Sequence, residues 1–371
     1  MMFGEVEATL PSEAWVTALL SLEGMGPARF AAITNELSPF EAWARLVEGL
    51  PVPKGVVSDE RVQKWRIAAR KLDVEVRWNA MGSLGISASA RGASDYPIRL
   101  VNDLEPPPVM YWRGHTMPDA PTVAIVGTRK CTSYGLRVAF ELGAALSRAG
   151  VSVVSGLALG IDASAHLGSI SVDDEEIPGG CWPIAVVGSG LDVIYPRRNR
   201  TLWTKIAERG VLFSEAPPGA QPEAWRFPAR NRIIAALSDA VIVIESRTQG
   251  GSLLTVDEAQ LRDVPVGAVP GPILSPSSVG TNQLLADGAT PILGVDDVLA
   301  MIGHIRPRSV SQPAQSPVSS ELLETMGWAP LLFDQICALS EDSPDLVATE
   351  VERLVTAGFC VRSGAFIERV R

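Results

Sequence analysis

The sequence predicts an α/β protein built on a parallel β-sheet. Short β-branched runs recur between about residue 80 and residue 302, and helix-length segments separate most of them. Gly-rich turns follow several of these runs, at the points where strands would end. Such an alternation produces βαβ units whose parallel sheet is buried on both faces. The expected strands are 122–126, 151–154, 184–187, 211–213, 241–245, 266–269 and 291–293.

Helices are expected before this central region. Apolar residues at helical spacing surround a Gly-Met-Gly-Pro break at 24–27, and a second amphipathic stretch covers 59–72. We therefore predict an N-terminal helical domain over residues 1–78, followed by the sheet domain over 79–302. The segment LEGMGPARF at 22–30 is similar to a helix-hairpin-helix turn, which contacts DNA backbone, but a plain helical hairpin explains it equally well.

The composition changes again after residue 302. Residues 303–320 are rich in Ser, Pro and Gln without periodicity, which is typical of a linker. Residues 321–371 contain two helical patterns, at 331–339 and 343–356, and then the alternating ending FCVRSGAFIERV. Helices followed by a small hairpin predict a winged helix.

Composition excludes several classes of protein. The chain has 371 residues, of which 46% are hydrophobic and 20% charged, as in folded globular proteins. No apolar run approaches the ~20 residues of a membrane span, and the first ten residues lack a signal-peptide pattern. We expect a cytoplasmic protein without a membrane partner. The four cysteines and three histidines lack disulfide or metal-ligand spacing, so no metal and no cofactor are expected.

The first expected strand runs into the turn Gly127-Thr128-Arg129-Lys130, and a helix is expected from residue 133. Ligands of parallel sheets bind outside the carboxyl ends of the strands, near helix N-termini. Gly127 permits a close backbone approach, and Arg129 can hold a phosphate with two hydrogen bonds. When this segment is taken alone, a plain turn with a solvated Arg129 is the better explanation.

Two further strands end in the same way. Ser155 and Gly156 follow the second strand, and Gly188 follows the third. This recurrence favours a phosphate-binding edge. Asp162 is expected in the first turn or at the N-cap of the next helix, and His166 is expected to pack or hydrogen-bond. Neither is assigned a catalytic role.

Positive charge gathers between residues 197 and 232, where eight cations face three acids in a chain of net charge −10. Tyr195, Trp203, Trp225 and Phe227 lie in or beside this stretch. Cations with aromatic platforms are characteristic of single-stranded nucleic-acid grooves, although a solvated helix face is the ordinary explanation of a charge run. The phosphate-type turns favour the groove. The C-terminal tail carries four cations and nine acids over residues 315–371, so we expect it to contact protein rather than DNA.

Taken together, these segments resemble the DNA-processing protein A family (DprA, also called Smf). The similarity includes VAIVGTRKCTSYG, VVSGLALGIDASAH and FPARNRIIAALSDAVIVIES, and it covers nearly 200 residues in order. The segments that carry it are 96–114, 123–135, 153–166, 186–196, 210–215, 227–246, 250–259 and 268–289. The resemblance implies an extended Rossmann-like domain that binds single-stranded DNA, forms a homodimer through this domain and loads RecA during natural transformation. It also implies an N-terminal helical domain of helix-hairpin-helix or SAM-like type and a C-terminal winged helix.

The predicted DNA contacts combine these observations. Arg129 and Lys130 would bind phosphates at the Gly127-Thr128 turn, with Ser155, Gly156 and Gly188 as backbone donors. Phe227 would stack a base, and Arg230, Asn231 and Arg232 would grip the strand, although a buried Asn231 could simply tie two loops together. The family usually has Ser-Gly-Ser where this chain has Gly250-Gly251-Ser252, and residues 173–176 look like an acidic insertion at the amino end of a strand.

The main alternative is an enzyme. Nucleoside-monophosphate phosphoribohydrolases have related Rossmann-like domains in which a Gly-Gly loop and a glutamate cleave an N-glycosidic bond. Gly250, Gly251, Thr255 and Glu258 occupy comparable positions, but the Pro-Gly-Gly-x-Gly-Thr form is absent. A nucleotide sensor is a third possibility. The preferred function is a non-enzymatic recombination mediator that binds and protects single-stranded DNA.

Overall fold

The computed structural model describes residues 10–53, 57–304, 321–328, 330–340, 342–356 and 358–369. The chain divides into two compact units, Met1–Ile305 and Arg306–Arg371, which are described separately below. Most of the predicted linker, residues 305–320, lies outside the described residues. In the part of the chain that is described, no helix is long and apolar enough to cross a bilayer.

The first unit contains the predicted parallel sheet. Its parallel strands pair in the order β6-β5-β4-β3-β7-β8-β9. They are β3 (Thr122–Val126), β4 (Ser152–Ser155), β5 (Ile184–Val186), β6 (Val211–Ser214), β7 (Ala240–Val243), β8 (Val266–Ala268) and β9 (Thr290–Pro291). Each predicted strand is present within one or two residues, and the predicted α/β class is confirmed.

Two strands that the sequence did not predict extend the sheet beyond β6. β2 (Val109–Gly114) pairs antiparallel with β6, placing Trp112 opposite Phe213, and β1 (Ser87–Ala90) pairs antiparallel with β2. β1, Ser-Ala-Ser-Ala, lacks β-branched residues and so has no strand signal in the sequence. The segment between β1 and β2, which contains α7 (Ile98–Val101), follows no βαβ pattern.

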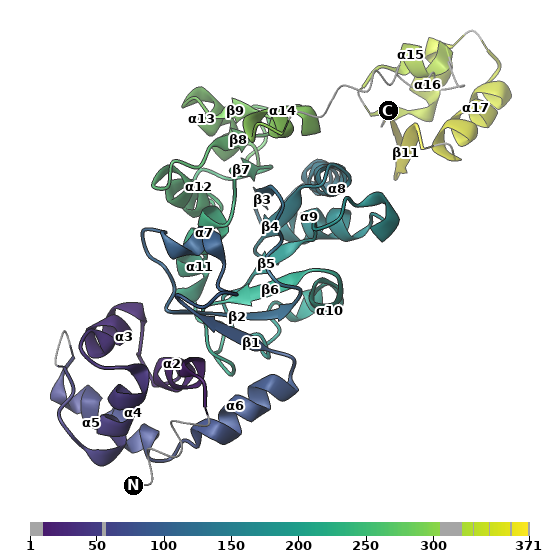
Figure 1. Cartoon of the computed structure of the whole chain (residues 1–371). Helices are drawn as coiled ribbons and strands as arrows, with labels where there is room; N and C mark the ends of the chain where they lie inside the picture. Colours follow the sequence, from purple (N-terminus) through teal and green to yellow (C-terminus); the bar gives the residue numbers. More distant parts are fainter. Residues whose placement is uncertain are drawn as a thin grey trace. The chain divides into compact units, whose positions relative to one another are not determined.

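Helices cover both faces of this sheet (Figure 1). Val123 and Ile125 of β3 point to one face, where α8 and α9 pack, whereas Ala124 and Val126 point to α11 and α12. The helices are α8 (Ser133–Arg148), α9 (Ile161–Ile170), α10 (Arg200–Arg209), α11 (Arg226–Ala236), α12 (Leu253–Gln260), α13 (Val279–Ala286) and α14 (Val295–Met301). The central strands are buried on both sides, as parallel sheets require.

The N-terminal region is helical, as predicted. It contains α2 (Ser12–Leu20), α3 (Pro27–Thr34), α4 (Pro39–Glu48), α5 (Asp59–Ala69) and α6 (Val74–Ser83). Its apolar core continues into the sheet through Tyr111 and Leu212, and the Tyr111 hydroxyl donates to Thr17 Oγ1 at 3.1 Å. The predicted domain boundary at residue 78 falls within α6. The turn between α2 and α3 has the predicted hairpin form, and its contact with DNA stays a prediction.

The second unit has its own core and a three-stranded antiparallel sheet in the order β10-β12-β11. Its elements are α15 (Glu321–Met326), β10 (Leu331–Leu332), α16 (Phe333–Leu339), α17 (Pro344–Thr356), β11 (Cys360–Ser363) and β12 (Phe366–Arg369). Ile336, Val351 and Leu354 are fully buried between them. Helices with a small antiparallel sheet are the predicted winged-helix arrangement.

The packing of α8 against α9 depends on two glycines and generates a stability prediction. A Cβ on Gly168 would lie 2.0 Å from the Phe140 carbonyl oxygen, and one on Gly143 would lie 2.3 Å from that of Ala165. Because backbone cannot move aside cheaply, Gly168→Ala should lower the free energy of unfolding by about 1–3 kcal/mol. Gly82→Ala is the matched control, since a Cβ there meets nothing within 4 Å. It should raise the free energy of unfolding by about 0.4–1 kcal/mol. Urea unfolding measures both, and equal effects would contradict the close approach.

Candidate nucleic-acid interface

A cavity of about 690 Å³ lies at the carboxyl ends of β3 and β7. The chain leaves β3 toward β4 on one side, while β7 pairs with the other side of β3. The segments that follow the two strands therefore diverge, and open α/β sheets bind ligands at such switch points. The turn after β3, the first part of α11 and the loop 247–255 line the cavity.

Exposed cations line this cavity. Arg129 and Lys130 project from the turn after β3, and Arg247 comes from the segment after β7. Within the described residues, none of the three forms an ion pair. Their charges are therefore available to an anionic ligand. The sequence analysis missed Arg247, although its position just beyond the fifth expected strand could have identified it.

An aromatic platform stands beside Arg129. The Phe227 ring lies 5.3 Å from the Tyr195 ring, centroid to centroid, and the Arg129 guanidinium carbon lies 5.6 Å from the Phe227 centroid. A recess of about 50 Å³ adjoins these side chains and is lined by Gly156 and Gly188 as well. A Cβ on Gly188 would lie 3.3 Å from the Phe227 ring, so this glycine leaves room for the aromatic side chain.

Arg230 forms part of the floor of the cavity and is almost completely buried. Its Nη1 donates to the carbonyl oxygens of Val186 and of Gly156, the latter at 2.5 Å. The Gly156 N–H in turn donates to Asp162 Oδ2 at 3.1 Å, so it is not free for a ligand in this conformation. Burial lowers the pKa of Arg230 to about 10, against the effect of Asp162, and burial raises the pKa of the Asp162 carboxyl against the effect of Arg230.

Three further predicted contacts line the cavity, whereas Ser155 does not. Gly127 and Thr128 line the cavity together with Asn231, whose amide nitrogen lies 3.5 Å from the Gly251 carbonyl oxygen. Asn231 therefore connects α11 to the Gly-rich loop, as its alternative explanation expected. The Ser155 hydroxyl is buried and donates to the Ile125 carbonyl oxygen at 2.6 Å, away from the cavity lining.

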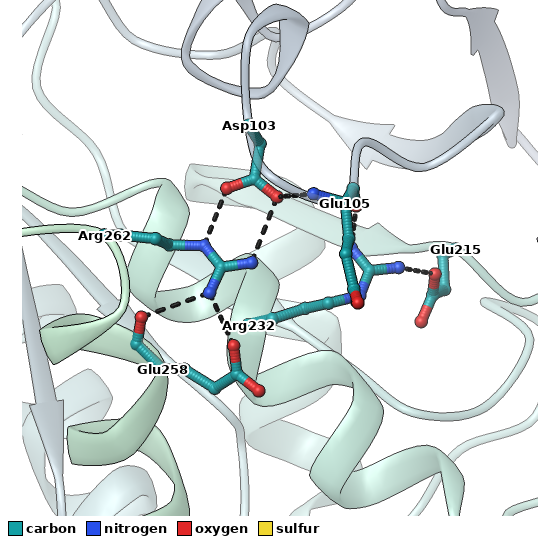
Figure 2. Close-up of polar contacts among 6 residues, drawn as sticks. All are labelled: Asp103, Glu105, Glu215, Arg232, Glu258 and Arg262. Carbon is teal, nitrogen blue, oxygen red and sulfur yellow. Dashed lines mark hydrogen bonds and ion pairs between the residues drawn. The ribbon is translucent and has the colours of Figure 1, made fainter.

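Arg232 is not brought into the cavity. It pairs with Glu215 and donates to the Glu105 carbonyl oxygen at 2.7 Å (Figure 2). Figure 2 also shows Arg262 between Asp103 and Glu258. Burial raises the pKa of the Glu215 carboxyl, against the effect of Arg232. These arginines attach the segment before β2 to α11 and α12.

The basic stretch 197–232 does not form one groove, and this part of the sequence interpretation is wrong. Trp203 is only 2% exposed and belongs to the core beneath α10. Arg209 donates to the carbonyl oxygens of Ile170 and Val172 and pairs with Asp174. α10 and β6 carry the chain from the carboxyl edge of the sheet to the amino edge and back, which separates these cations. The acidic segment 173–176 lies before β5 and contains a 3₁₀ turn at Asp174–Glu176, and its interpretation as an insertion stays a prediction.

Two buried ionisable residues lie on α9: Asp162, which lines the cavity, and His166. Asp162 lies in the first turn of α9, in agreement with its expected location. His166 lies one turn later and is fully buried, and burial lowers its pKa to about 4. A neutral imidazole packed in this way fits the expected packing role.

The N-terminus of α8 is occupied by a carboxylate of the chain itself. Glu245, which is 2% exposed, accepts hydrogen bonds from the Thr132 N–H at 2.9 Å and from the Thr132 hydroxyl at 2.5 Å. A Cβ on Gly135 would lie 2.6 Å from the Glu245 carboxyl carbon, so the helix has a glycine where the carboxylate approaches. Helix N-termini of this kind attract phosphate, and here Glu245 takes that position.

The fold and the cavity define a Rossmann-like α/β protein with a cavity lined by exposed cations at the switch point of its sheet. Residues 88–303 match the family model of DNA recombination-mediator protein A, and the chain belongs to this family. The family resemblance found in the sequence is thereby confirmed.

Individual relatives show the extent of the similarity. Protein Smf of Synechocystis is 41% identical over 216 residues, which are 57% of this chain and 52% of that protein. DNA processing protein DprA of Bacillus subtilis is 36% identical over 216 residues, which are 58% of this chain and 70% of that protein. The chain spans about half the length of the Synechocystis protein and of the Mycobacterium tuberculosis relatives, 52% and 47%.

Solved structures agree with the fold. The X-ray structure of DprA from Streptococcus pneumoniae superimposes with a TM-score of 0.60 and 28% identity, covering 77% of this chain and 97% of that one. DNA processing protein A from Helicobacter pylori, whose structure concerns a single-stranded DNA binding mode, gives a TM-score of 0.52 and 30% identity. It covers 58% of this chain and 95% of that chain.

The position of Arg230 generates a prediction that separates buried from exposed arginines. Arg230→Met should lower the free energy of unfolding by about 3–5 kcal/mol, because it leaves the Val186 and Gly156 carbonyl oxygens without their donor and removes the positive charge near the buried Asp162 carboxyl. Arg129→Met, at an exposed position, should change it by less than about 0.5 kcal/mol. Chemical unfolding of the two variants measures the difference. An Arg230→Met protein as stable as the wild type would contradict a structural role.

Proposed function

We propose that this chain is a non-enzymatic recombination mediator that binds single-stranded DNA at the carboxyl edge of its sheet. One observation carries the proposal. Arg129, Lys130 and Arg247 surround a single cavity without ion-pair partners among the described residues, and Phe227 and Tyr195 lie next to them. Cations that hold phosphates beside aromatic rings that stack bases are the working parts of single-strand binding sites. The single-stranded DNA binding mode of the Helicobacter pylori relative supports the same assignment.

Within this proposal the residues divide into two groups. Arg129 and Lys130, with Arg247, hold phosphates, while Gly127 and Thr128 let the sugar-phosphate backbone come close. Phe227 stacks a base in the space that Gly188 leaves open. Among the remaining predicted contacts, Arg230 and Asn231 line the cavity with side chains that bond to main-chain carbonyl groups, and Gly156 lines the adjoining recess. Ser155 and Arg232 support this surface from behind.

The contacts of two carboxylates disfavour the phosphoribohydrolase alternative. Gly250, Gly251 and Thr255 line the cavity, but Glu258 is absent from its lining and pairs with Arg262 at 2.5 Å (Figure 2). Glu245 occupies the helix N-terminus where a nucleotide phosphate would bind. A nucleotide sensor meets the same obstacle. If the purified protein released free base from AMP, the phosphoribohydrolase alternative would be correct instead.

The partners implied by the family resemblance belong to this proposal as well. RecA is the proposed protein partner during natural transformation, and the sheet domain is the proposed homodimer surface. The cytoplasmic location likewise stays a prediction from the sequence. Co-purification with RecA and light scattering of the purified chain test the two partners separately.

Reversing the charge of Arg129 tests the proposed function. Arg129→Glu should weaken binding of single-stranded DNA at least tenfold and leave the melting temperature unchanged, because Arg129 is exposed. If about four phosphates are neutralised in the wild type, log K should fall with log salt at a slope near −3, and the variant should show a shallower slope. Lys205→Glu makes the same charge change at an exposed position outside the cavity lining and is the control. If both variants bound single-stranded DNA equally well, the DNA-binding site would not lie at this edge of the sheet.

The acidic tail generates a second binding prediction. A chain ending at residue 304 should fold, because the first unit has its own cores. Residues 315–371 carry four cations and nine acids, so their removal should leave DNA affinity equal or slightly higher, with any gain disappearing at high salt. A winged helix that reads DNA would give the opposite result, namely weaker binding and a shallower salt slope after truncation. Fluorescence titration at two salt concentrations distinguishes the outcomes.

A further inference from the structure

An exposed tryptophan stands next to the cavity without belonging to its lining. Trp225 directly precedes α11 and is 54% exposed. Its neighbours Ala224 and Phe227 both line the cavity. A large aromatic ring that leaves much of its surface in water contributes little to a core, and such rings are enriched at binding surfaces.

The orientation of this ring is held by two neighbouring side chains. The indole Nε1 donates to Glu223 Oε2 at 2.7 Å, and the Arg226 guanidinium carbon lies 4.5 Å from the Trp225 centroid. Arg226 Nε also lies 3.6 Å from Glu223 Oε1. The indole N–H is therefore hydrogen-bonded, and the Arg226 guanidinium lies over the ring. The ring is presented to solvent in a fixed orientation, which reduces the conformational entropy lost when a ligand stacks on it.

We propose that Trp225 is a second stacking platform, used by a base of the same single strand of DNA after it leaves the cavity. The inference rests on the proposed function. Phe227 lines the cavity and would stack the base inside it. Trp225 lies outside the lining, directly after the lining residue Ala224, and would stack the base beyond the rim. Stacking is tolerant of sequence because every base has a π-face, so this platform would extend the site without adding base preference.

The C-terminal unit contains a matched control for this ring. Trp328 is 66% exposed, and the Arg369 guanidinium carbon lies 4.5 Å from its centroid. It reproduces the Trp–Arg pair of Trp225 and Arg226 but belongs to the acidic winged helix, which is not part of the proposed DNA site. A general effect of removing an exposed tryptophan would appear in both variants.

The test measures affinity for oligothymidylates of increasing length, from about 4 to about 20 nucleotides. Trp225→Ala should bind the shortest oligonucleotides as the wild type does and the longer ones about 5- to 160-fold more weakly, the range expected for loss of one stacked base. Phe227→Ala should lose affinity at every length, and Trp328→Ala at none. Trp225→Phe retains a ring and should recover most of the loss. Melting temperatures establish that each variant is folded.

Several outcomes would overturn the inference, and they separate it from the proposed function. Unchanged binding of Trp225→Ala at every length, while Arg129→Glu loses binding, overturns the platform alone and leaves the ring as a docking residue for a protein. An equal loss at every length would place the ring inside the primary site, which also overturns the inference. If the wild type binds no oligonucleotide, both proposals fail together.

Discussion

The cavity depends on one buried interaction, the contact of Arg230 with the ends of β4 and β5. Burying a guanidinium costs several kcal/mol unless its donors are satisfied. Here two main-chain carbonyl groups and the Asn231 side chain accept its hydrogen bonds, and Asp162 supplies a nearby negative charge. A Cβ on Gly156 would lie 2.2 Å from Arg230, so the glycine after β4 and the arginine of α11 require each other. The floor of the site is thus rigid before any ligand arrives.

This arrangement gives arginines of similar sequence context opposite roles. Arg232 and Arg262 pair with carboxylates and attach the segment before β2 to α11 and α12 (Figure 2). Arg230 is buried against carbonyl groups and holds α11 to the ends of β4 and β5. Arg129 and Arg247 are exposed on the same edge of the fold and have no such partners among the described residues. The chain as a whole carries a net charge of −10, yet the cavity gathers unpaired positive charge. Local charge, rather than net charge, decides what an anionic polymer meets there.

Glu245 occupies a helix N-terminus at the same edge of the sheet. In many Rossmann-like folds the first helix after the sheet's central strand presents its N-terminus to a phosphate. Here Thr132 donates two hydrogen bonds to Glu245 instead, and Gly135 makes room for the carboxylate. A small nucleotide loses its usual anchor, while a longer strand can still use cations spread around the cavity. Under the proposed function, the carboxylate would therefore favour a polymer over a mononucleotide.

The sequence by itself determined the seven parallel strands, the α/β class, the winged tail and the turn at Arg129, because these depend on local periodicity and on strand ends. It also located Phe227 and Asn231 beside the cavity. Only the tertiary structure decided which cations of the 197–232 stretch face a ligand: α10 takes Trp203 into the core and Arg209 to the opposite edge, and α11 turns Arg230 and Arg232 inward. A helix distributes neighbouring residues around its axis, so proximity in sequence does not predict a shared surface. Arg247 and Glu245 acquire their roles in the same way, because β7 pairs with β3 across more than a hundred residues of chain.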